Sequence, residues 1–94
     1  MKFLFVFLLV GISINVYGQS PYLDAGIEHG QKGEYQEAID DFSTAIRINP
    51  DYANVYHSRG ISKNYLGIDG CSDIKKAEAL GKFVHPHVMQ EVCN

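Results

Sequence analysis

The chain has 94 residues and a formal net charge of −3 at pH 7, with 8 basic and 11 acidic residues. This acidic balance argues against nucleic acid and anionic membrane surfaces as partners, because both attract basic proteins. A chain of this length forms one small domain, in which a hydrophobic core alone gives marginal stability.

The beginning of the chain has the order of a secretory signal peptide. Lys2 gives a basic start, residues 3–14 are almost entirely apolar, and Gly18 is a small residue suited to precede a cleavage site. The apolar stretch of about a dozen residues is shorter than the roughly 20 that a membrane-spanning helix needs, which argues against a retained anchor. We therefore expect residues 1–18 to be a signal peptide. The exported chain, in the periplasm or secreted, would then begin at Gln19 with a net charge of −4.

The rest of the chain repeats itself at one constant offset, which is the mark of a repeat architecture. The same offset relates Tyr22 to Tyr56, Gly26 to Gly60, and Gly33 to Gly67. Within the first unit, apolar residues recur at three- and four-residue intervals on both sides of a break at Gly33, and Pro50 ends the second stretch. Each unit therefore predicts two helices, and the chain an all-α fold.

This pattern resembles the tetratricopeptide repeat family. The residues that carry the resemblance, and that it implies to be packing positions, are Tyr22, Gly26, Ala38, Phe42, Ala45 and Pro50 in the first unit and Tyr56, Gly60, Ile74 and Ala77 in the second. The resemblance implies a short α-α solenoid with one repeat at 19–52, a second at 53–81 and a capping helix at 82–94. The end of the chain is also similar to small exported bacterial members with a cysteine-containing terminal repeat.

The second unit departs from the spacing of the first. Its large apolar residue, Ile74, comes two residues earlier than the constant offset, counted from Phe42, requires. We interpret this as a turn between the helices of the second pair that is shortened by two residues, with Asp69 as the N-cap of the next helix. The last helix is expected to open at His85-Pro86 and to pack on the preceding repeat.

The two cysteines, Cys71 and Cys93, are expected to form a disulfide, since two cysteines in an exported chain are first interpreted in this way. If the helix after Cys71 and the capping helix run antiparallel and have similar lengths, the start of the first lies beside the end of the second, which brings the two cysteines together. The alternative is two free, buried thiols.

The sequence predicts neither an enzyme nor a metal or cofactor site. It lacks a Gly-x-Ser-x-Gly motif and a phosphate-binding loop, so we expect no catalytic residue. The pair His85 and His87 supplies two possible metal ligands where a stable site takes three or four. His29 is interpreted as a packing residue rather than a base.

The resemblance implies a non-enzymatic protein-protein interaction module. In the family, the first helix of each pair lines a groove that binds another protein or a peptide. Carried over by position, the groove residues are Leu23, Ile27, Asn54, His57, Ile61 and Asn64, with Gly30 beside them. Two alternatives stay open: these side chains merely cover helix surfaces, or the chain is a structural unit that associates with further copies as a homo-oligomer.

Overall fold

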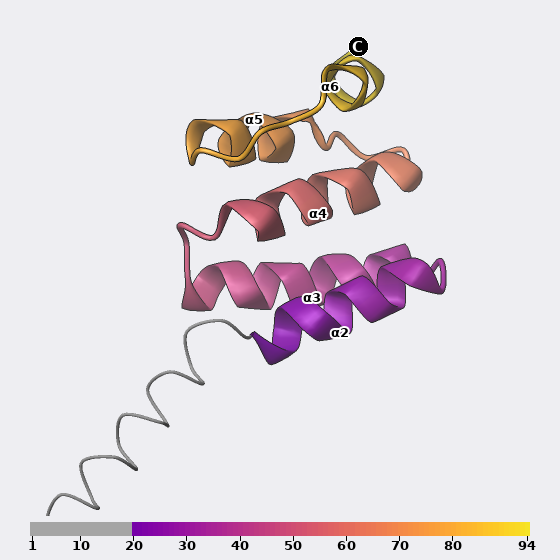
Figure 1. Ribbon diagram of the computed structural model, residues 1–94. Coiled ribbons are helices and arrows are strands. Elements are labelled where there is room, and N and C mark those ends of the chain that lie inside the picture. Colours follow the sequence, from indigo (N-terminus) through magenta and orange to yellow (C-terminus); the bar gives the residue numbers. More distant parts are fainter. Residues whose placement is uncertain (1–19) are drawn as a thin grey trace, which may run out of the picture.

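The computed structural model describes residues 20–94, and in this range the chain forms helices and no strands. The helices are α2 (Pro21–Gln31), α3 (Tyr35–Ile48), α4 (Ala53–Tyr65), α5 (Cys71–Ala79) and α6 (Pro86–Cys93) (Figure 1). The predicted all-α fold is therefore confirmed. The predicted signal peptide lies outside the described residues.

Two helices begin with a capping side chain followed by proline. Ser20 is the N-cap of α2, and its hydroxyl accepts a hydrogen bond of 3.2 Å from the backbone N–H of Leu23. His85 is the N-cap of α6, and Pro86 is the first residue of that helix, as the sequence predicted. Proline suits this position because it has no N–H to leave unpaired and its φ is already helical.

Three helices end on a glycine with a positive φ. These residues are Gly33 after α2, Gly67 after α4 and Gly81 after α5, with φ values of 81°, 74° and 101°. In each case the glycine and the residue after it donate their backbone N–H groups to carbonyl groups in the last turn of the helix. This motif requires a left-handed residue, which explains why glycine occurs at the same place in both repeats.

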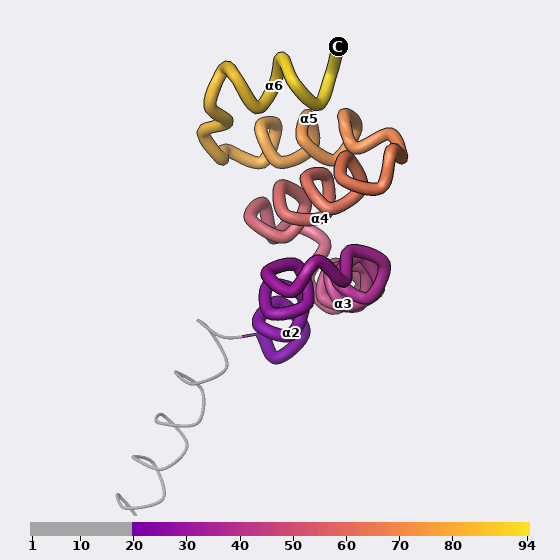
Figure 2. Tube along the Cα trace, turned by 90° about the vertical axis from the view of Figure 1, so that its right-hand side faces the viewer, coloured from indigo at the N-terminus to yellow at the C-terminus, as the bar shows by residue number. Residues whose placement is uncertain are grey.

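The helices pack as two successive pairs with α6 at the C-terminal end (Figure 2). α2 packs against α3, and α4 packs against α5. α4 also contacts α3, α2 and α6, so it lies at the centre of the stack. The first helices of the two pairs, α2 and α4, thus lie next to each other, which is the arrangement of a short solenoid.

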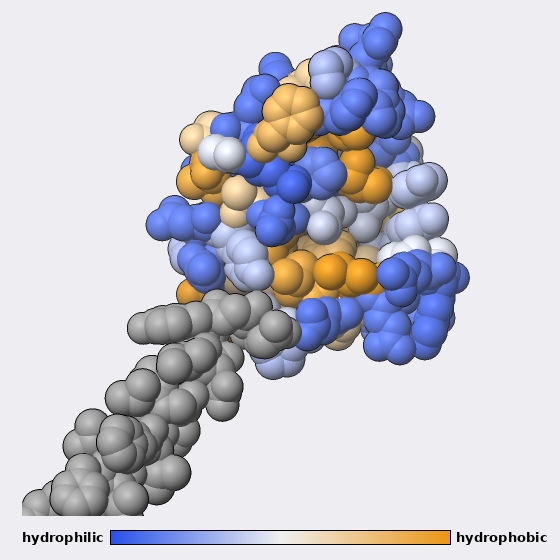
Figure 3. All heavy atoms as spheres, viewed as in Figure 1, coloured by the Kyte–Doolittle hydropathy of each residue, from blue (hydrophilic) through white to orange (hydrophobic). Residues whose placement is uncertain are grey.

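The hydrophobic core consists of two clusters, one for each half of the stack. The first cluster consists of Ala38, Phe42, Ala45 and Val55, with Leu23, Ile46 and Tyr52 packed against it. The second consists of Ile74, Val84 and Val92, with Ile61, Val88 and Met89 packed against it. α6 therefore completes the second cluster, as expected of a capping helix. On the outside, the face seen in Figure 3 carries apolar residues in separate patches among hydrophilic ones.

Glycines allow the two helices of each pair to cross closely. A Cβ atom at Gly26 would collide with the ring of Phe42, and one at Gly60 would lie 2.9 Å from Cδ1 of Ile74. Gly26 and Gly60 are equivalent positions of the two repeats, and each contacts the large apolar residue of the following helix. Phe42 and Ile74 are therefore structural equivalents, although the spacing between them is two residues shorter than the repeat.

The predicted shortening of the second turn is wrong. The connection between α2 and α3 covers residues 32–34, whereas the one between α4 and α5 is longer and covers 66–70. The shorter spacing arises in the helix instead. α5 begins three residues before Ile74, whereas α3 begins seven residues before Phe42, and this difference outweighs the longer turn. The N-cap of α5 is Gly70 rather than Asp69.

Asp69 nevertheless stabilises the beginning of α5. Its carboxylate accepts a hydrogen bond of 2.9 Å from the backbone N–H of Cys71. The N-cap position itself is held by glycine because a Cβ atom on Gly70 would collide with the backbone carbonyl of Gly60. Close packing of α4 on this turn therefore overrides the capping preference of the aspartate.

Most of the expected packing residues are buried, with three exceptions. Gly26, Ala38, Phe42, Ala45, Gly60, Ile74 and Ala77 are buried. Tyr56 is half-buried, while Tyr22, at 42% exposure, and Pro50 are exposed. Tyr22 and Pro50 therefore do not pack in the core. Tyr22 lies on the first turn of α2, which has no preceding repeat among the described residues to cover it.

A disulfide joins Cys71 at the start of α5 to Cys93 at the end of α6, with the two Cα atoms 4.8 Å apart. The predicted bridge is confirmed, and it links the two ends of the segment that closes the second core cluster. Among residues 20–94, no helix has both the length and the apolar character needed to cross a membrane.

Candidate functional site

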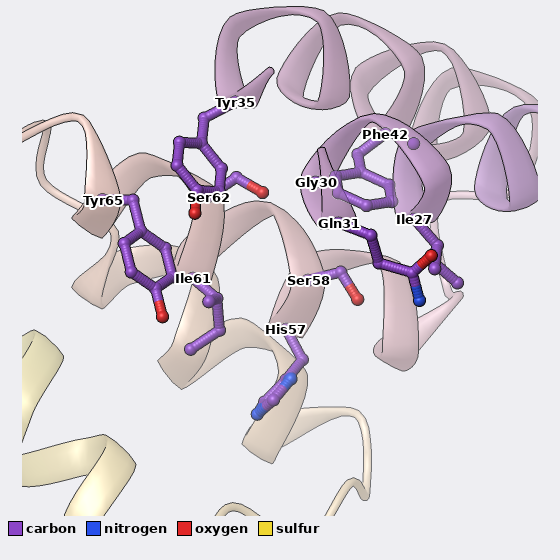
Figure 4. A pocket seen from close by; sticks show the side chains of 11 residues that line it. Ile27, Gly30, Gln31, Tyr35, Phe42, His57, Ser58, Ile61, Ser62 and Tyr65 are labelled. Carbon is purple, nitrogen blue, oxygen red and sulfur yellow. The ribbon is translucent and has the colours of Figure 1, made fainter. Parts of the chain in front are cut away.

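A pocket of about 350 Å³ lies between α2 and α4, the first helices of the two pairs. Its lining residues are Gly26, Ile27, Gly30 and Gln31 from α2, Tyr35 and Phe42 from α3, and His57, Ser58, Ile61, Ser62 and Tyr65 from α4 (Figure 4). Apolar atoms dominate this lining. A volume of this size lies at the lower end of the range for ligand pockets.

Half of the groove residues expected from the sequence line this pocket. Ile27, His57 and Ile61 are among the lining residues, together with Gly30. Leu23 instead packs against the first core cluster.

The two asparagines are not part of the pocket lining. Asn54 is exposed and Asn64 is half-buried. They lie on α4 but not among the residues of that helix that face α2.

The sequence-based interpretation missed Gln31, Tyr35, Ser58, Ser62 and Tyr65. Part of this set follows from helical spacing, because Gln31 comes four residues after Ile27. Tyr65 likewise continues the four-residue steps from His57 through Ile61. Tyr35 carries no such signal, because it belongs to the second helix of the pair and reaches the pocket only through the turn at Gly33.

Two tyrosines form one end of the pocket. The rings of Tyr35 and Tyr65 are stacked, with centroids 4.6 Å apart and planes 5° from parallel. The stack joins the beginning of α3 to the end of α4, so it connects the two repeats (Figure 4). Tyr65 is 64% exposed, which leaves a flat aromatic surface open to solvent beside the pocket.

His57 is the one titratable imidazole in the lining. Burial lowers the pKa of this imidazole below its ordinary value, and the positive charge of Lys82 lowers it further. His57 is therefore neutral over a wider pH range than a free histidine, and its ring offers one hydrogen-bond donor and one acceptor. With Ser58 and Gln31 it gives the apolar pocket a polar, uncharged rim.

The position of α4 is fixed by a largely buried ion-pair network between α4 and its neighbours α3 and α5. Arg59 donates two hydrogen bonds of 2.8 Å to Asp73 on α5 and one of 3.1 Å to the hydroxyl of Ser43 on α3. Lys63 lies 3.0 Å from the same carboxylate. The network ties α3, α4 and α5 together and so holds one wall of the pocket in place.

The position of α2 is fixed by a histidine between two carboxylates. Nδ1 of His29 lies 2.7 Å from Oε1 of Glu34, and its Nε2 lies 3.6 Å from Oδ2 of Asp41. The hydrogen bond with Glu34, together with the negative charges of Asp41, Glu34 and Glu37, raises the pKa of His29 above its ordinary value despite some desolvation. Oδ2 of Asp41 is buried without a hydrogen bond, and Nε2 of His29, 3.6 Å away, places a positive charge beside it whenever the imidazole is protonated.

The described residues hold no group of three or more His, Cys, Asp or Glu side chains arranged to bind a metal ion. The pocket lining contains no carboxylate, lysine or arginine. What this arrangement offers is a neutral surface of aromatic, aliphatic, hydroxyl and amide groups. Such a lining can make apolar contacts and a few uncharged hydrogen bonds.

Comparisons with known proteins agree with this architecture. Residues 28–63 match a family model described as TPR repeat, and this region includes most of the pocket lining. The chain is 30% identical over 53 residues to an uncharacterised protein of Methanocaldococcus jannaschii. The match covers 56% of this chain and 62% of that relative. No solved structure matches the chain.

Proposed function

We propose that this tetratricopeptide-repeat protein is a non-enzymatic interaction module that binds an extended segment of another protein between α2 and α4. TPR repeats generally mediate protein-protein interaction. The observation that carries the proposal is the pocket of about 350 Å³ between the first helices of the two pairs. An apolar side chain of the partner would enter this pocket, and the stacked Tyr35 and Tyr65 would contact the neighbouring residue.

The chemistry of the lining supports a peptide-like ligand. Ile27 and Ile61 offer aliphatic contact, while Gln31, Ser58 and neutral His57 can exchange hydrogen bonds with backbone groups. Because the rim carries no charge, it would not repel charged residues that flank the bound side chain in the partner's sequence. Tyrosine is enriched at protein interfaces because its ring gives a large contact area at low entropy cost.

The test is a selection of binders from a displayed library of random peptides. The variant Ile27→Glu places a charge in the pocket at a side chain that is 41% exposed, so the fold tolerates it. Ile48→Glu is the matched control, since Ile48 is 68% exposed and lies outside the pocket. We expect peptides selected on the wild type to bind Ile48→Glu equally and to lose at least ten-fold in affinity on Ile27→Glu. Equal binding to all three proteins would exclude the pocket as the binding site.

Self-association is the second candidate function. It is favoured by exposed apolar side chains in the connections between helices, notably Ile68 between α4 and α5 and Phe83 between α5 and α6, at 46% and 77% exposure. Analytical ultracentrifugation over a range of concentrations separates this function from the first. A mass that rises with concentration, and that falls back to that of a monomer in the variant Phe83→Ser, would support it.

We also propose that the protein is exported and that cleavage after Gly18 releases a chain beginning at Gln19. The disulfide between Cys71 and Cys93 supports this, because disulfides form and persist in oxidising compartments. N-terminal sequencing of the protein from the periplasmic and extracellular fractions of a bacterial host tests the proposal. Recovery of the intact amino terminus from the cytoplasm alone would contradict it.

A further inference from the structure

Two exposed imidazole rings face each other at the start of α6. The Nδ1 atoms of His85 and His87 are 2.7 Å apart, and the ring centroids are 4.4 Å apart with the planes tilted by 60°. Both residues are exposed, so a dissolved ion can reach them. Helix α6 lies at the opposite end of the stack from α2 (Figure 1). The two histidines are not among the residues that line the pocket.

The backbone holds this pair in place before any ion binds. His85 is the N-cap of α6, and its Nδ1 accepts a hydrogen bond of 3.4 Å from the backbone N–H of His87. Pro86 between them has a restricted φ and begins the helix. An ion on Nδ1 of His85 would replace this capping hydrogen bond. What remains after binding is the restricted backbone at Pro86, which lowers the conformational entropy lost on chelation relative to two histidines on a flexible chain.

The separation of the two nitrogen atoms matches that of neighbouring ligands on one metal ion. Imidazole nitrogen atoms bind at about 2.0–2.1 Å, so two of them at a right angle lie about 2.9 Å apart. The observed 2.7 Å is close to this separation. The two Nδ1 atoms now share a hydrogen bond, so an ion would displace the proton between them, and each ring would rotate to turn its lone pair towards the ion. The spacing of the two residues is visible in the sequence, and the structure adds the convergence of their Nδ1 atoms.

The kind of ligand, imidazole nitrogen with water, selects the ion. The described residues provide no third His, Cys, Asp or Glu to complete the pair, so water must occupy the remaining positions. With two imidazole ligands, the ion that binds most tightly is Cu²⁺, which stands at the top of the order of divalent affinities and accepts square, nitrogen-and-oxygen coordination. We propose that His85 and His87 together chelate one Cu²⁺ ion on the exposed face of the capping helix.

The test is a titration of the disulfide-bonded protein, purified without a histidine tag, with CuCl₂ by isothermal calorimetry. We expect one site per chain, weaker than a site with three or four protein ligands, with His85→Asn and His87→Gln each weakening Cu²⁺ binding at least ten-fold. Asparagine at position 85 retains a helix N-cap, so this variant keeps α6 folded. His57→Gln, which removes a histidine from the pocket, is the matched control and is expected to bind Cu²⁺ like the wild type.

Electron paramagnetic resonance of the copper-loaded protein gives a second readout, and coupling to two nitrogen atoms is the expected signature. The proposal is overturned if the double variant His85→Asn, His87→Gln still binds one Cu²⁺ with wild-type affinity. It is also overturned if ZnCl₂ or NiCl₂ binds this site more tightly than CuCl₂. If His57→Gln alone loses Cu²⁺ binding, the ion binds in the pocket rather than at His85 and His87, and the proposal is wrong.

Discussion

Arg59 and Asp73 form a two-fold hydrogen-bonded ion pair across the interface between α4 and α5, with both N–O distances at 2.8 Å. Burial, the largest single influence, raises the pKa of Asp73. The hydrogen bonds from Arg59 and Lys63 together outweigh it and bring this pKa below its ordinary value. The carboxylate thus stays ionised in a largely buried position because two cations compensate it. Ser43 accepts a third hydrogen bond from the same guanidinium, so the pair also orients α3.

The variant Arg59→Ala is expected to lower the free energy of unfolding by about 3 kcal/mol, because it leaves the carboxylate of Asp73 buried with Lys63 as its one remaining cation. Arg47→Ala is the matched control. Arg47 is exposed and donates one hydrogen bond to Thr44 on its own helix, so its loss should change stability by less than about 0.5 kcal/mol. Urea denaturation followed by circular dichroism measures both. Equal effects of the two substitutions would show that the network does not hold the helices together.

Two glycines on α2 should respond in opposite directions to the same substitution. A methyl group at Gly26 would collide with the ring of Phe42, whereas one at Gly30 would meet no atom within 4 Å. We expect Gly26→Ala to destabilise the fold by about 1–3 kcal/mol. Gly30→Ala should stabilise it by about 0.5–1 kcal/mol, since alanine is the better helix former. Thermal unfolding of both variants tests this, and destabilisation by Gly30→Ala would contradict the open space seen there.

The fold could be predicted from the sequence because its signals are local. The glycines that end α2 and α4 recur at the constant offset of the repeat, and each is required by a left-handed turn. The small residues Gly26 and Gly60 mark the crossings of the helices in the same way. The connection before α5 could not be predicted, because the spacing of Ile74 reports a loss of two residues without saying whether the turn or the helix lost them.

The pocket could be predicted only in part. Ile27, His57 and Ile61 follow from the position of each residue in its repeat. Tyr35 and Tyr65 meet because the α2–α3 turn and the end of α4 lie side by side, and this is a tertiary contact that no single helix pattern encodes. The network of Arg59 was missed for the same reason, since its partners lie 14 and 16 residues away on other helices.

Removing the disulfide should loosen the C-terminal end of the stack before the rest. The double variant Cys71→Ser, Cys93→Ser opens a loop between residues 22 apart in sequence, which should cost about 3 kcal/mol in the chain-entropy model. Hydrogen exchange is expected to accelerate first in α6, whose Val92 belongs to the second core cluster. A reducing agent should reproduce the effect in the wild type and leave the double variant unchanged. Uniform acceleration over all helices would contradict a separately released cap.

His29 in the first helix pair and His57 in the second are both half-buried. Their contributions to the free energy of unfolding should change in opposite directions with pH. The pKa of His29 is raised, chiefly by its hydrogen bond with Glu34, so the folded state binds this proton more tightly than the unfolded state. Its contribution is complete below the ordinary value of 6.5 and is lost as the pH rises through the raised pKa. The loss of stability caused by His29→Gln should therefore be larger at about pH 6 than at about pH 8.5.

The pKa of His57 is lowered, first by burial and then by Lys82, so the unfolded state binds this proton more tightly. Its neutral form therefore favours folding above the ordinary value of 6.5, and this advantage is lost as the pH falls below it. Glutamine cannot be protonated, so the free energy of unfolding of His57→Gln should rise relative to that of the wild type as the pH falls. The free energy of unfolding of His29→Gln should approach that of the wild type as the pH rises. Urea denaturation of the three proteins at both pH values measures these trends. If the two variants follow the same trend with pH, the assigned surroundings of one of the two imidazoles are wrong.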